Sequence, residues 1–284
     1  MKKILITAAF VLVSMVSGQA QVVTPQASPK AVIEQKVGLT DVKIEYSRPS
    51  ARGRAVYGEL VPFGRMWRTG ANANTIITFS SDVVIAGKPL KAGQYALFTQ
   101  PKADSWDVIF YADTNNWGLP EKYDDKKEVL RASVKPEFLS RPVETLTIGV
   151  NGLDNDFAFL EIAWEKTMVA LKFEVPTRQT AMKSIETAMS GPSANDLFSA
   201  AQYYYQSNGD MNKALAWMNQ ALAKFPANEA PFYFLRQKSL IQAKMGDKKG
   251  AIETAKLSLA ASEKAGNADY VKMNKDSINE WSRK

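Results

Sequence analysis

Apolar and polar residues alternate along much of the chain between residues 31 and 176. The alternation is clearest over residues 42–46, 106–110, 146–150 and 160–164, where apolar residues occupy every second position. A period of two is typical of strands that bury one face. Turn residues separate these runs, and no helical segment lies between them. The pattern therefore predicts an antiparallel β-sandwich or jelly-roll-like domain.

The pattern becomes helical after Pro176. Two Gly-Asp pairs, at residues 209–210 and 246–247, stand 37 residues apart, and each separates two helical segments. The small and apolar residues that follow the two pairs align across this interval, which resembles the tetratricopeptide repeat. Two such repeats bury little core, so we expect flanking helices over residues 177–189 and 268–283 to complete it. In the second of these helices, an apolar stripe is predicted to face the core, formed by Tyr270, Met273, Ile278 and Trp281.

The fold class that these patterns predict is α+β with segregated parts. The β domain spans residues 31–176, and an all-α, tetratricopeptide-like module follows over residues 177–284. Aromatic clusters at residues 203–205 and 232–234 fall at helical positions. Packing between helices explains them, and a concave face that holds a peptide is the alternative.

Residues 1–20 have the three parts of a secretory signal peptide. Two lysines precede an apolar run over residues 4–16, and small residues precede a cleavage site after Ala20. The run is short for a transmembrane anchor, and a chain without cysteine cannot be a lipoprotein. We therefore expect a periplasmic or secreted protein with no transmembrane span after cleavage and a flexible arm over residues 21–30.

The chain contains no histidine and no cysteine. These absences exclude disulfides, thiolate chemistry, the Ser-His-Asp triad and the common zinc sites, and we predict no metal and no cofactor. Residues 154–156 fit either a calcium site or a hairpin turn, and the turn is favoured because the full calcium-loop pattern is missing. The formal charge of +7 is spread along the chain without a basic stripe, which argues against nucleic acid binding.

Residues 46–74 concentrate arginine among glycines and prolines. The segment has no lysine, and its arginines are Arg48, Arg52, Arg54, Arg65 and Arg68. A guanidinium group pairs with carboxylate or phosphate through a planar fork, so the segment could form an anion pocket. The commoner alternative is that the arginines clamp loops to carboxylates such as Asp82, Asp104 or Asp113.

Several short motifs stand in and after this arginine-rich segment. They include Ser47-Arg48-Pro49, Arg52-Gly53-Arg54, Trp67-Arg68, Gly70-Ala71-Asn72 and Ala92-Gly93-Gln94-Tyr95-Ala96-Leu97. Together they resemble the bacterial family catalogued as domain of unknown function 2911, over about residues 28–175. The resemblance implies secretion and supports the domain boundary. It implies no activity, so it supplies no catalytic residues.

The candidate ligand-binding residues are Arg52, Arg54, Arg68, Asn72 and Trp117. Trp117 lies in a loop among asparagines, where its ring could stack on a sugar. Trp106 alternates with Val108 and is therefore predicted to belong to the core.

These observations favour an exported, non-enzymatic binding or docking protein of the cell envelope. It would take an anionic or glycan ligand on the β domain and an envelope protein or peptide on the helices. The alternative is a hydrolase of envelope or dietary polysaccharide that uses two carboxylates, for which Glu59, Asp107 and Asp113 are available. A purely structural envelope component is the third hypothesis, and the missing histidine and cysteine favour the first and third.

Overall fold

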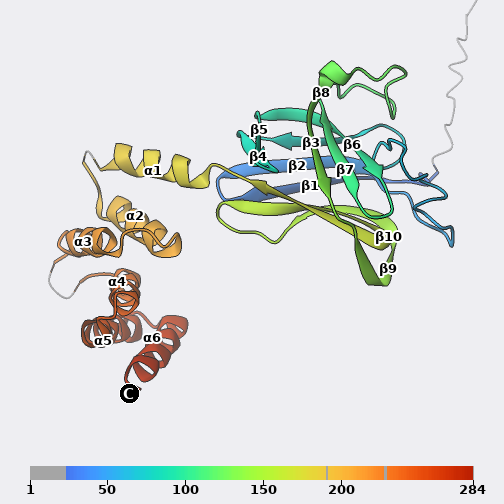
Figure 1. The fold of residues 1–284 in the computed structure, drawn as a ribbon. Helices are drawn as coiled ribbons and strands as arrows, with labels where there is room; N and C mark the ends of the chain where they lie inside the picture. Colours follow the sequence, from blue (N-terminus) through green and yellow to red (C-terminus); the bar gives the residue numbers. More distant parts are fainter. Residues whose placement is uncertain (1–23, 190, 227–228, 284) are drawn as a thin grey trace, which may run out of the picture.

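The computed structural model describes residues 24–189, 191–226 and 229–283, in which an antiparallel β domain precedes a region of six helices (Figure 1). This confirms the predicted α+β arrangement. The signal peptide prediction, over residues 1–20, lies outside the described residues.

Two antiparallel sheets make up the β domain. The first sheet has the strand order β1-β2-β3-β6-β7-β8, and the second has the order β5-β4-β10-β9. The strands are β1 (Lys30–Val37), β2 (Thr40–Ser47), β3 (Thr75–Phe79), β4 (Val83–Ile85), β5 (Lys88–Leu90), β6 (Gly93–Pro101), β7 (Trp106–Tyr111), β8 (Glu128–Val134), β9 (Glu137–Asn151) and β10 (Phe157–Glu174).

The apolar residues of the alternating runs form one core between the two sheets. Trp106 and Trp164 are each 1% exposed, so the prediction that Trp106 belongs to the core is confirmed. A polar link also crosses between the sheets, because the hydroxyl of Tyr46 donates to the carbonyl of Ile148 (3.1 Å) and accepts from its N–H (2.9 Å). These polar groups are thereby satisfied inside the core.

β10 is one long strand in which the buried side of the alternation changes. Even-numbered residues are buried up to Trp164, and odd-numbered residues are buried from Val169 onward. Between them, Glu165 has a left-handed φ of +53°, and the register with β9 shifts on both sides of it. The two alternating runs of the sequence thus belong to a single strand that a bulge divides.

β7 is buried on both faces, although the sequence alternation predicts one buried face. Its outer face carries Ile109 and Tyr111, which form a second, smaller cluster with Phe98 of β6. Met66 of the arginine-rich segment and Tyr123 of the loop after β7 pack against this cluster. Two long loops therefore cover the outside of the six-stranded sheet.

The six described helices follow β10 directly, and Gly-Asp pairs punctuate them as predicted. The capping box at Ser193 and Asp196 is present at the start of α2. Asp210 and Asp247 cap the starts of α3 and α5 by accepting backbone N–H groups. The helices are α1 (Thr177–Ala188), α2 (Ala194–Gln206), α3 (Met211–Leu222), α4 (Phe232–Lys244), α5 (Lys248–Lys264) and α6 (Ala268–Trp281).

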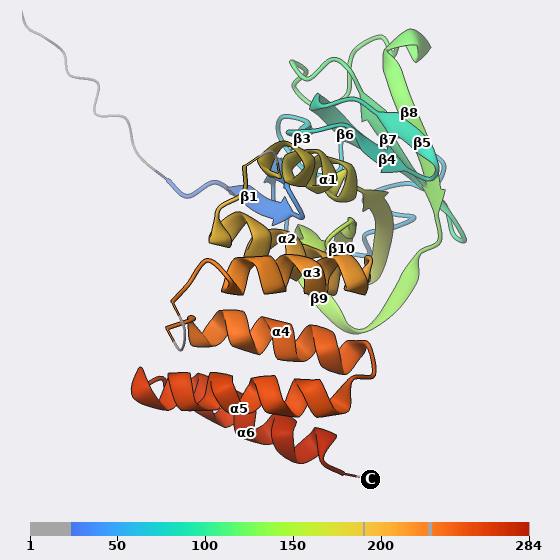
Figure 2. The same ribbon diagram turned by 90° about the vertical axis from the view of Figure 1, so that its left-hand side faces the viewer.

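The helices pack as successive antiparallel neighbours, seen side-on in Figure 2. Of the aromatic cluster at residues 203–205, Tyr204 supplies the buried ring of α2, and not Tyr205, which the repeat pattern of the sequence places at the large aromatic position. In α6 the buried residues are the polar Asn274 and Ser277, not the apolar stripe of the sequence, because α6 packs on polar groups of α4 and α5. The tetratricopeptide identity of the helices stays a prediction.

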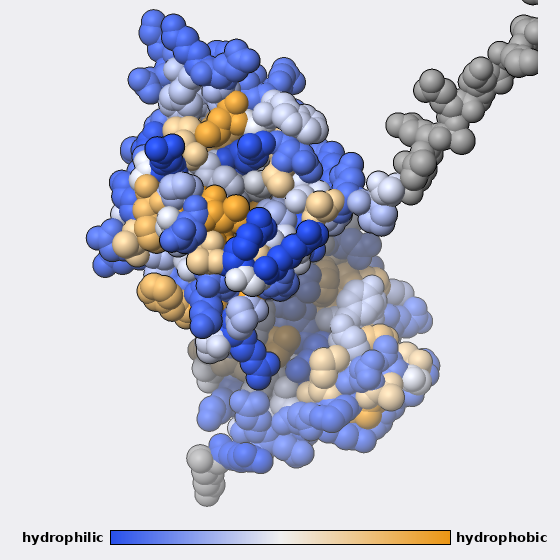
Figure 3. Space-filling view, turned by 90° about the vertical axis from the view of Figure 1, so that its right-hand side faces the viewer, coloured by the Kyte–Doolittle hydropathy of each residue, from blue (hydrophilic) through white to orange (hydrophobic). Residues whose placement is uncertain are grey.

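The β domain meets the helices at a tight junction. A side chain on Gly38, in the turn between β1 and β2, would collide with the hydroxyl of Thr177 and the carbonyl of Asn155. Figure 3 looks at the opposite side of the molecule from Figure 2 and shows a recess between the β domain and the helices. No helix among the described residues has both the length and the hydrophobicity to cross a bilayer.

Candidate functional site

The arginine-rich segment closes the gap between β2 of one sheet and β9 of the other. The N–H of Ala51 donates to the carbonyl of Glu144 (2.8 Å), and the N–H of Leu146 donates to the carbonyl of Pro49 (2.9 Å). Arg48 reinforces this crossing, since its Nε donates to the carbonyl of Leu146 (2.9 Å). The first part of the segment is therefore an additional short stretch of pairing on the edge of β9.

The arginines of the segment bind neutral oxygens. Arg54 donates to the carbonyls of Ala51 (2.9 Å) and Ser50 (2.8 Å), and Arg68 donates to the carbonyl of Asn72 (2.7 Å). None of the segment's arginines pairs with a carboxylate among the described residues.

The carboxylates proposed as their partners are engaged elsewhere or lie apart. Asp82 pairs with Lys91 (2.8 Å) and Asp113 pairs with Lys127 (2.9 Å). The prediction that the arginines clamp loops to carboxylates is therefore wrong for the described residues, and Arg48, Arg54 and Arg68 bind backbone carbonyl oxygens instead.

The structure brings three of the five candidate residues together. Asn72 and Trp117 line a surface groove of about 510 Å³. Arg68 holds the backbone of Asn72 and lies against Gly118, where a Cβ would stand 2.7 Å from its Nη1. Arg52 and Arg54 do not line this groove.

Arg52 lies instead at the crossing over β9. Its side chain is exposed, its φ is +52°, and its N–H donates to a carboxylate oxygen of Glu144 (2.7 Å). The two ends of the arginine-rich segment thus have different surroundings, and only the later end reaches the groove.

The groove has one aromatic wall and one polar wall. The ring of Trp117 is 78% exposed. Asn72 also lines the groove, and its side-chain amide makes only long contacts, to the carbonyl of Ser28 (3.3 Å) and the hydroxyl of Ser47 (3.4 Å). Lys30 adds a cation that pairs with Glu45 (2.6 Å). The polar wall therefore offers hydrogen-bonding groups that are weakly used within the chain.

Hydrogen bonds and an ion pair hold both ends of the loop that carries Trp117. Near its start, Asp113 accepts from the N–H of Asn115 (3.2 Å) through its carboxylate and from the amide of Asn116 (3.1 Å) through its carbonyl. Near its end, Lys127 reaches back to Asp113. The ring of Tyr123 lies 4.9 Å from that of Tyr111, measured between centroids. The loop thus holds Trp117 at a defined place.

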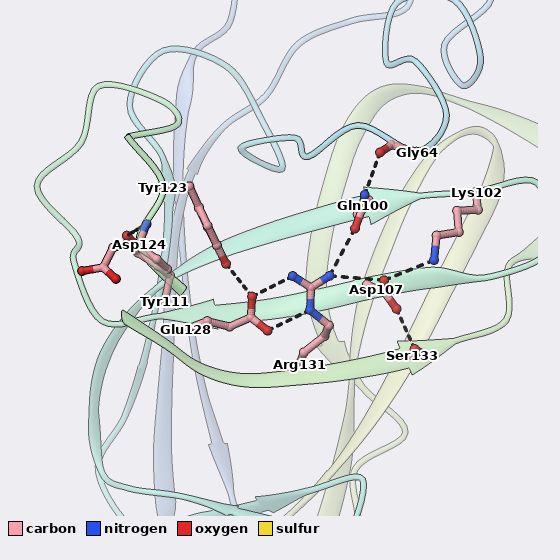
Figure 4. A network of polar contacts seen from close by, with 10 residues as sticks. All are labelled: Gly64, Gln100, Lys102, Asp107, Tyr111, Tyr123, Asp124, Glu128, Arg131 and Ser133. Carbon is pink, nitrogen blue, oxygen red and sulfur yellow. Dashed lines mark hydrogen bonds and ion pairs between the residues drawn. The ribbon is translucent and has the colours of Figure 1, made fainter. Parts of the chain in front are cut away.

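A polar network spans the outer face of β6, β7 and β8 beside this loop (Figure 4). Arg131 of β8 is its centre. It binds Glu128 through Nη2 (2.7 Å) and Nε (2.8 Å), and Asp107 through Nη1 (3.3 Å). The hydroxyl of Tyr123 donates to Glu128 (2.6 Å), and that of Ser133 donates to Asp107 (2.6 Å). The network therefore links the Trp117 loop to the sheet.

The β domain matches a known protein family. A family model described as a protein of unknown function, DUF2911, matches residues 28–173. The chain belongs to the DUF2911 family. The matched range ends within β10, so the helices lie outside it. No curated protein gives a significant match to the chain.

The carboxylates of the DUF2911 network are poor general acids. The hydrogen bond from Arg131 is the largest effect on Glu128 and lowers its pKa. Burial alone would raise the pKa of Asp107, but the hydrogen bonds from Ser133 and Lys102 and the charge of Arg131 outweigh it and lower the pKa. Both groups are ionised at neutral pH, whereas glycoside hydrolysis needs one protonated carboxyl group.

Several other acidic groups have a pKa that is shifted in the same direction. Each carboxyl group in the described chain whose pKa departs from its usual value is lowered, Asp113 among them through the hydrogen bond from Lys127. Glu59 is exposed on the surface of the DUF2911 domain. No group of acidic residues in the described chain is arranged to hold a metal ion.

Residues 154–156 form a turn of the DUF2911 domain. The N–H of Asp154 donates to the carbonyl of Phe157 (2.9 Å), and the carboxylate of Asp154 accepts from the N–H of Asp156 (3.3 Å). These bonds are those of a turn between two strands, which is the alternative that the sequence favoured.

Sequence reasoning missed several groove and network residues. Lys30 and Ser47 stand at paired positions of β1 and β2, so only the strand register brings them to the groove. Asp107 and Ser133 are likewise cross-strand partners of β7 and β8. The one available signal was Ser47, which stands in a DUF2911 motif.

The helices carry a groove of their own, outside the DUF2911 match. It has a volume of about 870 Å³ and lies among α1, α2 and α3. Met182, Ile185, Met189 and Trp217 give it apolar walls, and Lys213 lies over the Trp217 ring (5.0 Å).

Proposed function

We propose that this protein is an exported, non-enzymatic binding protein that takes a carbohydrate in the groove at Trp117. The observation that carries the proposal is that Trp117, 78% exposed, lines one groove with Asn72, whose side-chain amide makes only long hydrogen bonds. An aromatic face with hydrogen-bonding groups at its edge suits a sugar ring, whose faces are apolar and whose rim carries hydroxyls. Periplasmic or secreted localisation is part of the proposal and rests on the character of residues 1–20.

A neutral sugar fits the groove better than a simple anion. Lys30 already pairs with Glu45, and Arg68 already binds the carbonyl of Asn72. Lys30 already has a carboxylate partner and Arg68 does not line the groove, so stacking and hydrogen bonding supply the affinity. An anionic ligand is the second class to test.

The test is a thermal-shift and calorimetric screen of the purified protein against neutral oligosaccharides, peptidoglycan fragments and inorganic phosphate. A ligand that binds only the folded state raises the melting temperature. We expect a sugar to do so, and Trp117→Ala to weaken its binding by at least about fivefold, since an aromatic stacking contact contributes about 1 kcal/mol or more. Leu119→Ala is the matched control, because Leu119 is exposed in the same loop and does not line the groove.

Three results would contradict the carbohydrate proposal. They are a screen without a sugar shift, equal binding by Trp117→Ala, or a shift with phosphate alone. Product analysis of the same mixtures tests the alternative hydrolase. Cleavage that Asp107→Asn abolishes would replace binding by catalysis as the function.

We also propose that the helices dock an envelope protein or peptide. The apolar groove among α1, α2 and α3 and the aromatic residues of α2 and α4 support this role. An exposed apolar surface next to aromatic side chains is typical of peptide-binding helical modules.

A further inference from the structure

α4 carries a half-buried cation that has no carboxylate partner. Arg236 donates through Nη1 to the hydroxyl of Ser277 (3.0 Å) and to the amide oxygen of Asn274 (3.4 Å), both on α6. Both acceptors are neutral. No acidic group of the described residues lies within ion-pair distance of Arg236. Burial lowers the pKa of its guanidinium group, against the smaller opposing effects of Tyr205, Tyr270 and Asp276.

The acidic residue that acts on Arg236 is already engaged. Asp276 pairs with Lys272, one turn earlier on α6, at 2.6 Å. The β domain shows the usual arrangement for comparison, because the partly buried Arg131 has two carboxylates, Glu128 and Asp107. A charge withdrawn from water is stabilised by a counter-ion, and Arg236 lacks one among the described residues.

A second cation on the same helix, the solvent-exposed Lys244, also has no carboxylate partner among the described residues. Lys244 donates to the backbone carbonyl of Tyr205 (2.7 Å) and to the amide oxygen of Asn208 (2.6 Å), and it lies over the Tyr205 ring (4.6 Å). Its partners are also neutral. Near Arg236, the amide nitrogen of Gln237 is buried without an acceptor among the described residues. α4 therefore presents an excess of donors and positive charge.

These groups belong to one face of the helical region. α4 contacts α2 on one side and α6 on the other, and Figure 1 shows these three helices on the side toward the β domain, with α3 and α5 in the outer row. Arg236 and Lys244 are eight residues apart on α4, which corresponds to about 12 Å along the helix axis. An extended peptide covers that distance in about four residues.

We propose that the α2–α4–α6 face binds an acidic, extended segment of a partner polypeptide, with one carboxylate on Arg236 and a second on Lys244. This inference rests on the proposed docking role of the helices and adds a second surface to it, apart from the apolar groove among α1, α2 and α3. Arg236 would receive its carboxylate through the planar fork, and Lys244 would act as a point charge. The rings of Tyr205 and Tyr270 lie beside the two cations and give the intervening residues an aromatic surface.

The test is fluorescence anisotropy with the full chain and a labelled eight-residue peptide that carries two glutamates four positions apart. A twin peptide with glutamines in their place removes only the charges. We expect the acidic peptide to bind, the glutamine peptide to bind at least about tenfold more weakly, and Arg236→Gln and Lys244→Gln each to weaken the acidic peptide by about tenfold or more. Lys238→Gln makes the same charge change on the same helix and should alter binding less than about twofold.

Circular dichroism melts and a polyphosphate binding measurement show what causes each result. Circular dichroism melts of each variant show whether binding is lost through unfolding, and Lys244→Gln is the second variant if Arg236→Gln does not fold. Equal binding of both peptides would show that the face does not recognise the carboxylates. It would overturn the inference and leave the docking role intact. Absence of binding by either peptide, or tighter binding of polyphosphate than of the acidic peptide, would overturn the inference as well.

Discussion

At the scale of single residues, Arg131 is the side chain on which most polar contacts of the DUF2911 domain converge. Its guanidinium group joins Glu128 and Asp107, whose side chains are only 18% and 12% exposed. Both carboxylates have a pKa below the ordinary value, so both favour the ionised form in the folded state. Removal of the cation would leave two nearly buried like charges on one sheet face.

We expect Arg131→Met to lower the free energy of unfolding by about 2 kcal/mol at pH 7. The loss is smaller than for a wholly buried pair, because the Arg131 side chain is 35% exposed and water screens it. Urea unfolding at neutral pH measures the difference. Arg141→Met is the control, because Arg141 is exposed on β9 and its loss should change stability by less than about 0.5 kcal/mol.

The same network makes stability depend on pH in one direction. A carboxyl group with a lowered folded-state pKa binds its proton more readily in the unfolded chain, so its contribution is present above pH of about 4 and is lost as the pH falls further. We therefore expect the difference between Arg131→Met and the unchanged protein to shrink at pH 3. An equal difference at both pH values would show that the effect of the substitution is packing and not charge.

The arginine-rich segment shows what residue type can and cannot predict. Its composition suggested an anion pocket or clamps to carboxylates, and the described arginines of the segment make no such ion pair. It could not indicate the acceptors, since carbonyl oxygens serve as well as carboxylates and those that Arg48 uses lie about a hundred residues away. Asn72 and Trp117 were named as separate candidates, and the sequence did not indicate that they line one groove with Lys30 and Ser47, because the strand register is not written in local sequence.

At the scale of secondary-structure elements, Gly-Asp pairs start the helices of the all-α region. Asp210 accepts the N–H groups of Asn212 (2.9 Å) and Lys213 (3.2 Å), and Asp247 accepts that of Gly250 (2.9 Å). These bonds satisfy donors that the first turn of a helix leaves unpaired.

We expect Asp210→Ala to lower the free energy of unfolding by about 1 kcal/mol, the usual contribution of an N-cap. Asp210→Asn should retain most of it, because an asparagine oxygen accepts the same two bonds. Far-ultraviolet circular dichroism during urea unfolding measures both variants. If Asn lowers stability as much as Ala does, the charge of Asp210 and not its capping geometry is responsible.

Element boundaries were predictable where apolar and polar residues alternate strongly. The predictions failed where contacts between distant parts of the chain determine which residues are buried. The first half of β9 was missed because its side chains are largely exposed, so it carries no alternation to detect. The buried face of α6 was wrong because Asn274 and Ser277 are buried through hydrogen bonds to Ser258 and Arg236, which a hydrophobic pattern cannot reveal.

At the scale of the whole molecule, Gly38 governs how closely the β domain meets the helices. Its φ is +54°, and its Cα faces Thr177 at the start of α1 and the carbonyl of Asn155. Any side chain there combines a strained backbone with a collision.

We expect Gly38→Ala to lower the free energy of unfolding by about 3 kcal/mol and to speed tryptic cleavage after the exposed Arg178. Gly53→Ala is the matched control, because Gly53 also has a left-handed φ, +72°, and a methyl group added there would have no neighbouring atom within 4 Å. Gly53→Ala should lower the free energy of unfolding by only about 1 kcal/mol and leave the rate of tryptic cleavage unchanged. Equal losses in the two variants would mean that backbone strain alone, and not the junction, determines the effect.

The bulge in β10 also fixes the direction in which the helices leave the β domain. Only Val175 and Pro176 stand between the end of β10 and α1, so the orientation of the last strand residues passes straight to the first helix. Deleting one residue at Glu165 would turn the following side chains to the opposite face, bury Lys172 and Glu174, and expose Phe173. The bulge residue Glu165 thus determines on which side of the sheet the chain leaves β10. Its deletion would place the six described helices on the other side.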